Sequence, residues 1–252
     1  LDGMPYGLME DFGRDGTMPN FGALIEDGVF RPLASSIPEV SSVAWSSVIT
    51  GRNPGEHGIY GFIDVAPGTY RRTFPNFSNL KAAPFWEQDP ERRAVILNVP
   101  TTYPARELNG VLVAGFVALD LEQATYPRSL VPTLQGLDYR VDVDSQKAHQ
   151  SLDFFLRDLD KTLDARIATY RHLWKTVDWD IFMLVFTGTD RLAHFLWDAY
   201  EEPGHRHYEA FRDHFKKIDA VIGELDEQLD AQDILMMLSD HGFERLHQNV
   251  YL

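Results

Sequence analysis

The sequence contains no cysteine. This absence excludes disulfide bonds and cysteine metal ligands, so any metal site must be built from histidine, aspartate and glutamate. It also excludes the sulfatase nucleophile that is derived from a cysteine.

Long apolar runs are missing as well. No stretch approaches the roughly 18 consecutive apolar residues that mark a membrane helix, so no membrane span is predicted. No basic segment followed by an apolar one opens the chain, so no signal peptide is visible. Together with the lack of cysteine, these absences slightly favour a cytoplasmic location over other compartments.

Positive charge is scarce. The chain has 23 lysine and arginine residues against 38 aspartate and glutamate residues, which gives a net charge of −15. This balance argues against binding to a nucleic-acid backbone as the main role. It would also repel an anionic phosphate ester, unless bound metal ions supplied local positive charge. The composition therefore argues against a phosphate site that lacks metal.

Apolar residues make up 44% of the 252 positions, which is ample for the core of one large domain or two small ones. Short apolar runs of strand length alternate with segments of helical periodicity. The expected strands cover residues 31–37, 93–99, 111–117, 139–143, 180–186 and 234–238, and the expected helices cover residues 18–30, 152–176 and 211–225. This alternation predicts an α/β fold with a largely parallel sheet flanked by helices. Because no linker or repeat interrupts it, we expect one domain over residues 1–252.

One serine lies at the expected start of a helix, where negative charge is favoured. Ser41 precedes a short apolar segment, residues 43–49, that Gly51 closes, which is typical of a helix with serine at its start. The free N–H groups and the dipole of such a terminus favour negative charge. An ordinary N-cap is the alternative, and taken alone it is the commoner role for serine in this position.

Metal-binding residue types recur elsewhere in the chain. Asp190 and His194 are four apart and share a face if the segment is helical. Asp240 and His241 directly follow an apolar run, and Asp2 stands at the start. Both pairs fall just past the carboxyl ends of expected strands, where ligands bind in open α/β sheets. With Ser41, the set suits two metal ions and a nucleophile, although each motif alone is weak.

These motifs also carry a family resemblance. The segments IPEVSSVAWSSVITGRNPGEHGI, NVPTTYP with GVLVAGF, TDRLAH and SDHGF occur in an order that resembles the type I phosphodiesterase/nucleotide pyrophosphatase family of the alkaline phosphatase superfamily. The resemblance implies an alkaline phosphatase-like sandwich and two divalent ions, zinc first and manganese as the main rival. One ion would be bound by Asp2, Asp240, His241 and Ser41. The other would be bound by Asp190, His194 and a further histidine.

The implied activity is hydrolysis of a small-molecule phosphate diester or nucleotide pyrophosphate through a covalent phosphoserine at Ser41. A phosphomonoesterase, or a phosphomutase or phosphotransferase, on the same scaffold is the alternative. A catalytically silent binding module is the alternative outside enzymes, and the intact set of six site residues argues against it.

The sequence departs from the family pattern at residue 44, in the third metal-binding histidine and in the segment before Asp2. Ala44 stands where the best-known branch places an asparagine, so a nucleotide preference does not follow. His247 is the only histidine after SDHGF, and it is a weak substitute for the third histidine of the second metal. No strand precedes Asp2. The resemblance therefore predicts a catalytic domain that is truncated at both ends.

Overall fold

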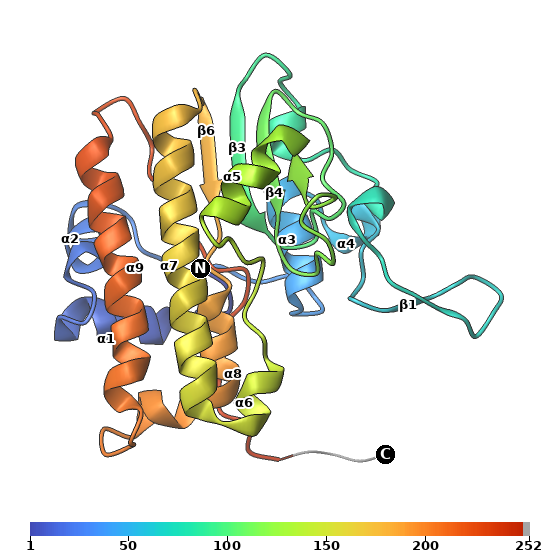
Figure 1. The fold of residues 1–252 in the computed structure, drawn as a ribbon. Coiled ribbons are helices and arrows are strands. Elements are labelled where there is room, and N and C mark those ends of the chain that lie inside the picture. Colours follow the sequence, from blue (N-terminus) through green and yellow to red (C-terminus); the bar gives the residue numbers. More distant parts are fainter. Residues whose placement is uncertain (249–252) are drawn as a thin grey trace.

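The computed structural model describes residues 1–248, and its centre is a four-stranded sheet in the order β5-β4-β3-β6 (Figure 1). The strands are β3 (Ala94–Val99), β4 (Gly110–Ala114), β5 (Thr125–Tyr126) and β6 (Ile181–Leu184). β3 pairs in parallel with β4 and with β6, and the short β5 is antiparallel to β4. The prediction of an α/β fold with a largely parallel sheet is confirmed.

β3 is central because it can be buried on both faces. Every one of its six residues is buried, as expected for a continuous apolar run in a parallel sheet. Since successive side chains point to opposite faces, Val95 and Leu97 face one core while Ala94 and Ile96 face the other. The sheet therefore separates two apolar layers.

The helices divide between these two layers (Figure 1). The longest is α7 (Leu152–Thr176), and with α9 (Tyr208–Gln228) it covers the face towards which Val95 points. On the other face, α3 (Ser41–Thr50) packs through Trp45 and Ile49. The remaining helices are α1 (Tyr6–Asp15), α2 (Pro19–Asp27), α4 (Pro54–His57), α5 (Val131–Gly136), α6 (Gln146–Gln150) and α8 (Gly188–Glu201). The helices expected over residues 18–30, 152–176 and 211–225 are confirmed.

Short elements complete the chain. β1 (Asp64–Val65) and β2 (Arg72–Thr73) form a small antiparallel ribbon that projects away from the sheet (Figure 1). Three single 3₁₀ turns lie at Phe77–Asn79, Phe85–Glu87 and Arg128–Leu130. No helix among residues 1–248 is long and apolar enough to cross a membrane.

Three expected strands are wrong. Residues 31–37 form an irregular, largely exposed connection, in which Leu33 is 70% and Ile37 is 88% exposed. Residues 139–143 also form no strand, because the guanidinium of Arg166 donates hydrogen bonds to the backbone carbonyls of Arg140 and Val141 at 2.8 and 2.7 Å. Those carbonyls would otherwise be free to accept ladder hydrogen bonds.

Residues 234–238 are the third correction. They lie across an apolar groove of about 580 Å³ from β6, and both segments line it. Ile234 and Met236 are 86% and 76% exposed. An apolar run becomes a strand only when a neighbouring backbone comes within hydrogen-bond reach, and within the described residues no strand pairs with this segment.

Candidate active site

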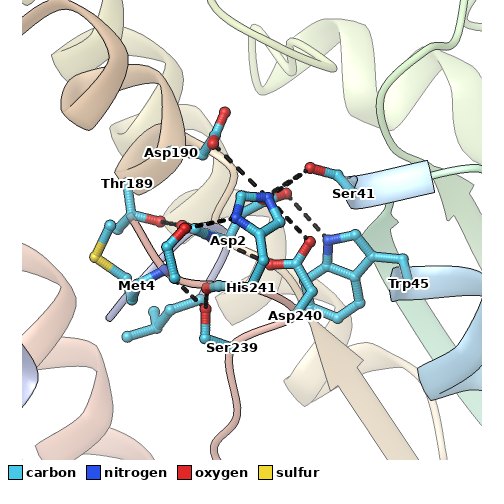
Figure 2. Close-up of polar contacts among 12 residues, drawn as sticks. Asp2, Met4, Ser41, Trp45, Thr189, Asp190, Ser239, Asp240 and His241 are labelled. Carbon is cyan, nitrogen blue, oxygen red and sulfur yellow. Dashed lines mark hydrogen bonds and ion pairs between the residues drawn. The ribbon is translucent and has the colours of Figure 1, made fainter. Parts of the chain in front are cut away.

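The six residues singled out from the sequence come from four separate segments and meet at one place. Figure 2 labels five of them, all but His194. Asp2 lies before α1, Ser41 is the first residue of α3, and α8 carries Asp190 and His194. Asp240 and His241 follow residues 234–238. A cavity of about 470 Å³ opens here, and all six border it except Asp240, which is buried behind His241.

The hydroxyl of Ser41 does not cap its own helix. The residue before α3 is Val40, and no side chain caps this helix, so the alternative of an ordinary serine N-cap is wrong. The Oγ atom lies 2.9 Å from Nε2 of His241 and 3.4 Å from Oδ1 of Asp2. The hydroxyl therefore sits beside a helix N-terminus and between two groups that can bind a metal ion.

Asp2 is held rigidly among the sheet and helices. Its amide donates to the carbonyl of Phe186 at 3.1 Å, and its own carbonyl accepts from the hydroxyl of Thr189 at 2.6 Å. Its side-chain Oδ2 accepts from the indole N–H of Trp45 at 3.1 Å. Because Oδ2 is taken, Oδ1 is the oxygen turned towards Ser41.

Asp240 and Asp190 each keep one oxygen without a hydrogen bond. Oδ1 of Asp240 accepts from the amide of Gly3 at 3.1 Å, whereas its Oδ2 is buried with no hydrogen-bond partner. Oδ2 of Asp190 pairs with Arg191 at 3.3 Å, whereas its Oδ1 is likewise buried and without a hydrogen bond. Buried polar atoms are almost always satisfied in folded proteins, so these two oxygens are unusual.

Electrostatic repulsion concentrates at the same point. Burial raises the pKa of the Asp2 carboxyl well above its usual range, and the nearby carboxylates of Asp240 and Asp190 raise it further. The hydrogen bond from Trp45 opposes this rise. Burial also raises the pKa of Asp240, against the opposing effect of His241. A cation placed among these groups would relieve both the desolvation and the repulsion.

The donor set fits a divalent metal ion. Asp2, Asp190 and His241 each offer one ligand atom, and the three atoms lie within 4.8 Å of one another. Nε2 of His194 lies 3.4 Å from Oδ1 of Asp190, at the more exposed rim of the cavity. His247 is exposed and does not belong to the clustered donors. The third histidine expected for a second metal is therefore not supplied by it.

The close packing around Asp190 depends on Gly3. This glycine has φ of +69°, in the left-handed region, and a Cβ atom added to it would lie 2.8 Å from Oδ1 of Asp190. Glycine is required here both for the turn after Asp2 and for the approach of α8.

Several groups at the site went unnoticed in the sequence. Trp45 and Thr189 hold Asp2, and Arg191 holds Asp190. The rings of Phe62 and Phe116 meet edge to face at 5.6 Å in the cavity wall. Arg191 could have been noticed, since it directly follows Asp190 in TDRLAH, and Phe116 could have been noticed because it closes the segment GVLVAGF. Phe62 lies outside the quoted motifs.

Comparison with known proteins bears on the family and the fold. A family model described as type I phosphodiesterase / nucleotide pyrophosphatase matches residues 1–252. Two crystal structures of phosphonoacetate hydrolase from Sinorhizobium meliloti 1021 share the fold. The complex with phosphonoformate has a TM-score of 0.60 at 19% identity, and the complex with phosphonoacetate has 0.58 at 18%. Each match covers 90% of this chain and 52% of the other, so the chain spans about half the length of these structures. No curated protein matches the sequence.

Proposed function

Because the chain belongs to the type I phosphodiesterase / nucleotide pyrophosphatase family, we propose that it carries the nucleophile and metal ligands of a hydrolase that cleaves phosphate diesters or nucleotide pyrophosphates. The observation that carries the proposal is the position of Ser41, whose Oγ lies within 3.4 Å of Asp2 and His241 at a helix N-terminus. Such a hydroxyl, beside buried carboxylates that lack partners, is suited to phosphoryl transfer.

Two groups of residues would hold the metal ions. Asp2, Asp240, His241 and Ser41 would bind one, and Asp190 and His194 would contribute to the other. Zinc suits this mixed set of nitrogen and oxygen ligands, and manganese is the alternative. When bound, such ions lower the pKa of a coordinated hydroxyl and neutralise charge on the attacked phosphate oxygens.

In the proposed reaction, Ser41 is the nucleophile. Oγ of Ser41 gives up its proton to solvent and forms a bond to phosphorus as the bond from phosphorus to the leaving oxygen breaks. The leaving group takes up a proton and departs as an alcohol from a diester, or as a phosphate from a pyrophosphate. Water then attacks the phosphoserine, which releases a monoester and restores the hydroxyl. Ser41 is the first residue of α3, and a helix N-terminus favours the negative charge that develops on phosphate oxygens.

The substrate class is a small molecule. The cavity of about 470 Å³ is within the usual range for small-ligand sites, and the net charge of −15 disfavours a nucleic-acid polymer. The phosphonoacetate hydrolase structures hold phosphonoformate and phosphonoacetate, which are small phosphonates. These observations support a compact phosphate ester.

Ser41→Ala tests the proposal directly. Bis(4-nitrophenyl) phosphate and 4-nitrophenyl phosphate would be assayed with the purified protein, with added zinc or manganese and with a chelator. We expect chelator-sensitive diester hydrolysis that falls by about 10³-fold or more in Ser41→Ala, because loss of a nucleophile usually costs at least this much. Ser47→Ala, six residues along α3, is the matched control; Ser47 contacts His57 and does not line the cavity.

The possible outcomes separate the alternatives. Full metal-dependent activity in Ser41→Ala would refute the nucleophile assignment. Monoester turnover far above diester turnover would indicate a phosphomonoesterase. Turnover only with an added alcohol or sugar acceptor would indicate a phosphotransferase or phosphomutase. Metal binding without turnover of either ester would favour a silent binding module.

A further inference from the structure

Arg191 links the candidate metal site to a carboxylate outside it. Its Nε and Nη2 donate to Oδ2 of Asp142 at 3.0 and 2.8 Å, and its Nη1 donates to Oδ2 of Asp190 at 3.3 Å. The guanidinium also lies 4.3 Å from the centre of the Phe116 ring. With 18% of its side chain exposed, the group is fixed on three sides.

Asp142 is itself fixed by α7. Its flanking residues are tied to that helix, since Oδ2 of Asp158 accepts from the amide of Asp144 at 3.0 Å and Arg166 donates to the carbonyl of Val141 at 2.7 Å. These contacts hold the irregular segment at residues 139–144 against the helix. The carboxylate that orients Arg191 is therefore anchored in the core and does not depend on a mobile surface loop.

The two carboxylate oxygens of Asp190 therefore have different surroundings. Oδ2 is occupied by Arg191, whereas the buried Oδ1 has no hydrogen bond and faces His194 and His241 at 3.4 and 4.0 Å. We infer that Arg191, oriented by Asp142, is a positioning residue that presents only Oδ1 of Asp190 to a divalent cation. This inference rests on the metal site of the proposed function.

Asp142 affects the metal site because it neutralises part of the positive charge of Arg191, which would otherwise act on Asp190 alone. The three groups Asp142, Arg191 and Asp190 sum to −1, so Asp190 keeps a negative charge for a cation. The guanidinium of arginine is always charged in proteins, so its positive charge is divided between the two carboxylates that it contacts. Without Asp142, the planar fork could turn fully onto Asp190, pair with both oxygens and compete with the metal.

Asp142→Asn is the variant that tests this inference, because it keeps the shape of the side chain and removes its charge. Cobalt(II) would be titrated into the metal-free protein, with affinity measured by competition with a chromophoric chelator and ligand geometry followed by visible absorption. We expect affinity to fall by about 10–100-fold, the usual effect of removing a partner of a metal ligand, and the absorption bands to change. Metal-free unfolding midpoints would be measured in parallel.

Two further variants make the test specific. Glu224→Gln breaks the pair between Arg171 and Glu224, which joins α7 and α9 away from the cavity, and should leave cobalt binding unchanged. Arg191→Lys keeps the positive charge but loses the planar fork that donates to Asp142 and Asp190 in a fixed geometry, so it should also weaken binding and alter the spectrum. It serves as the test if Asp142→Asn does not fold.

The outcomes distinguish the inference from the proposed function. If the wild-type protein binds no cobalt, zinc or manganese, the metal site of the proposed function fails. If the wild type binds cobalt and either folded variant binds it with the same affinity and spectrum, the positioning role is wrong while the metal site stands.

Discussion

Replacing Gly3 with alanine should damage both stability and metal binding, for two separable reasons. The residue has φ of +69°, a conformation that costs a residue with a Cβ atom roughly 1–2 kcal/mol. The new Cβ would also lie 2.8 Å from Oδ1, 3.0 Å from Cβ and 3.2 Å from Cα of Asp190. Overpacking of this kind typically adds about 1–3 kcal/mol. We therefore expect the free energy of unfolding to fall by about 2–5 kcal/mol.

The clash has a second effect, because the displaced atom is the oxygen of Asp190 that faces the other donors. Urea unfolding of the metal-free protein would give the loss of stability, and cobalt titration would give the change in affinity. We expect affinity to fall by about tenfold or more, as for other disturbances of a ligand's surroundings.

Gly16→Ala separates strain from clash. Gly16 has φ of +84°, and an added Cβ would meet nothing within 4 Å. This variant should lose only the roughly 1–2 kcal/mol of backbone strain and should bind cobalt normally. If Gly3→Ala were no less stable than Gly16→Ala and bound cobalt equally well, the close approach of Gly3 to Asp190 would be refuted.

Three further predictions concern the core and two titrating groups. Leu97→Ala, in the fully buried β3, should cost about 2–5 kcal/mol in urea unfolding, and a loss below about 1 kcal/mol would contradict its central place. Burial lowers the pKa of His214 to about 3 from 6.5, so the unfolded chain takes up a proton that the folded protein excludes. The free energy of unfolding should therefore fall by up to about 1.4 kcal/mol per pH unit below pH 6.5. His214→Gln should reduce that slope. Hydrogen bonds from Arg93 lower the pKa of Asp180 to about 2. Carboxyl NMR should show the pKa returning towards its ordinary range in Arg93→Gln, and an unchanged titration would rule the pairing out.

The sequence predicts those elements whose local pattern determines them. The run at residues 93–99 is apolar throughout and of strand length, and β3 occupies it; the apolar stripe of residues 152–176 is α7. α1 (Tyr6–Asp15) was not predicted, since Gly7 and Gly13 lower its helix propensity. Residues 234–238 have as good a strand pattern as β3, but no strand partner within the described chain. Strand pairing is a long-range property that composition alone does not specify.

The residues of the candidate site could likewise be predicted only in part. Ser41 and Asp190 could be predicted because recognisable motifs contain them, and the structure places both beside one cavity. The pairing of Asp142 with Arg191 could not, since the two are 49 positions apart and Asp142 lies in a segment expected to be a strand. Partners of metal ligands are chosen by geometry, and any acidic residue on a nearby loop would have the same sequence signature.

The contacts that join Gly3 to Asp240 and Ser41 to His241 also constrain when the site can form. The bond from the Gly3 amide to Asp240 spans 237 residues, and that between Ser41 and His241 spans 200. At a synthesis rate of roughly 10 residues per second, the first of these groups leaves the ribosome about 20 s before its partner. During that interval the sheet and α7 can assemble from segments already made, while Gly3 lacks Asp240 and Ser41 lacks His241. Because the bonds to Asp240 and His241 cannot form until those residues are made, we expect the site to be the last part of residues 1–248 to fold, with metal capture after it.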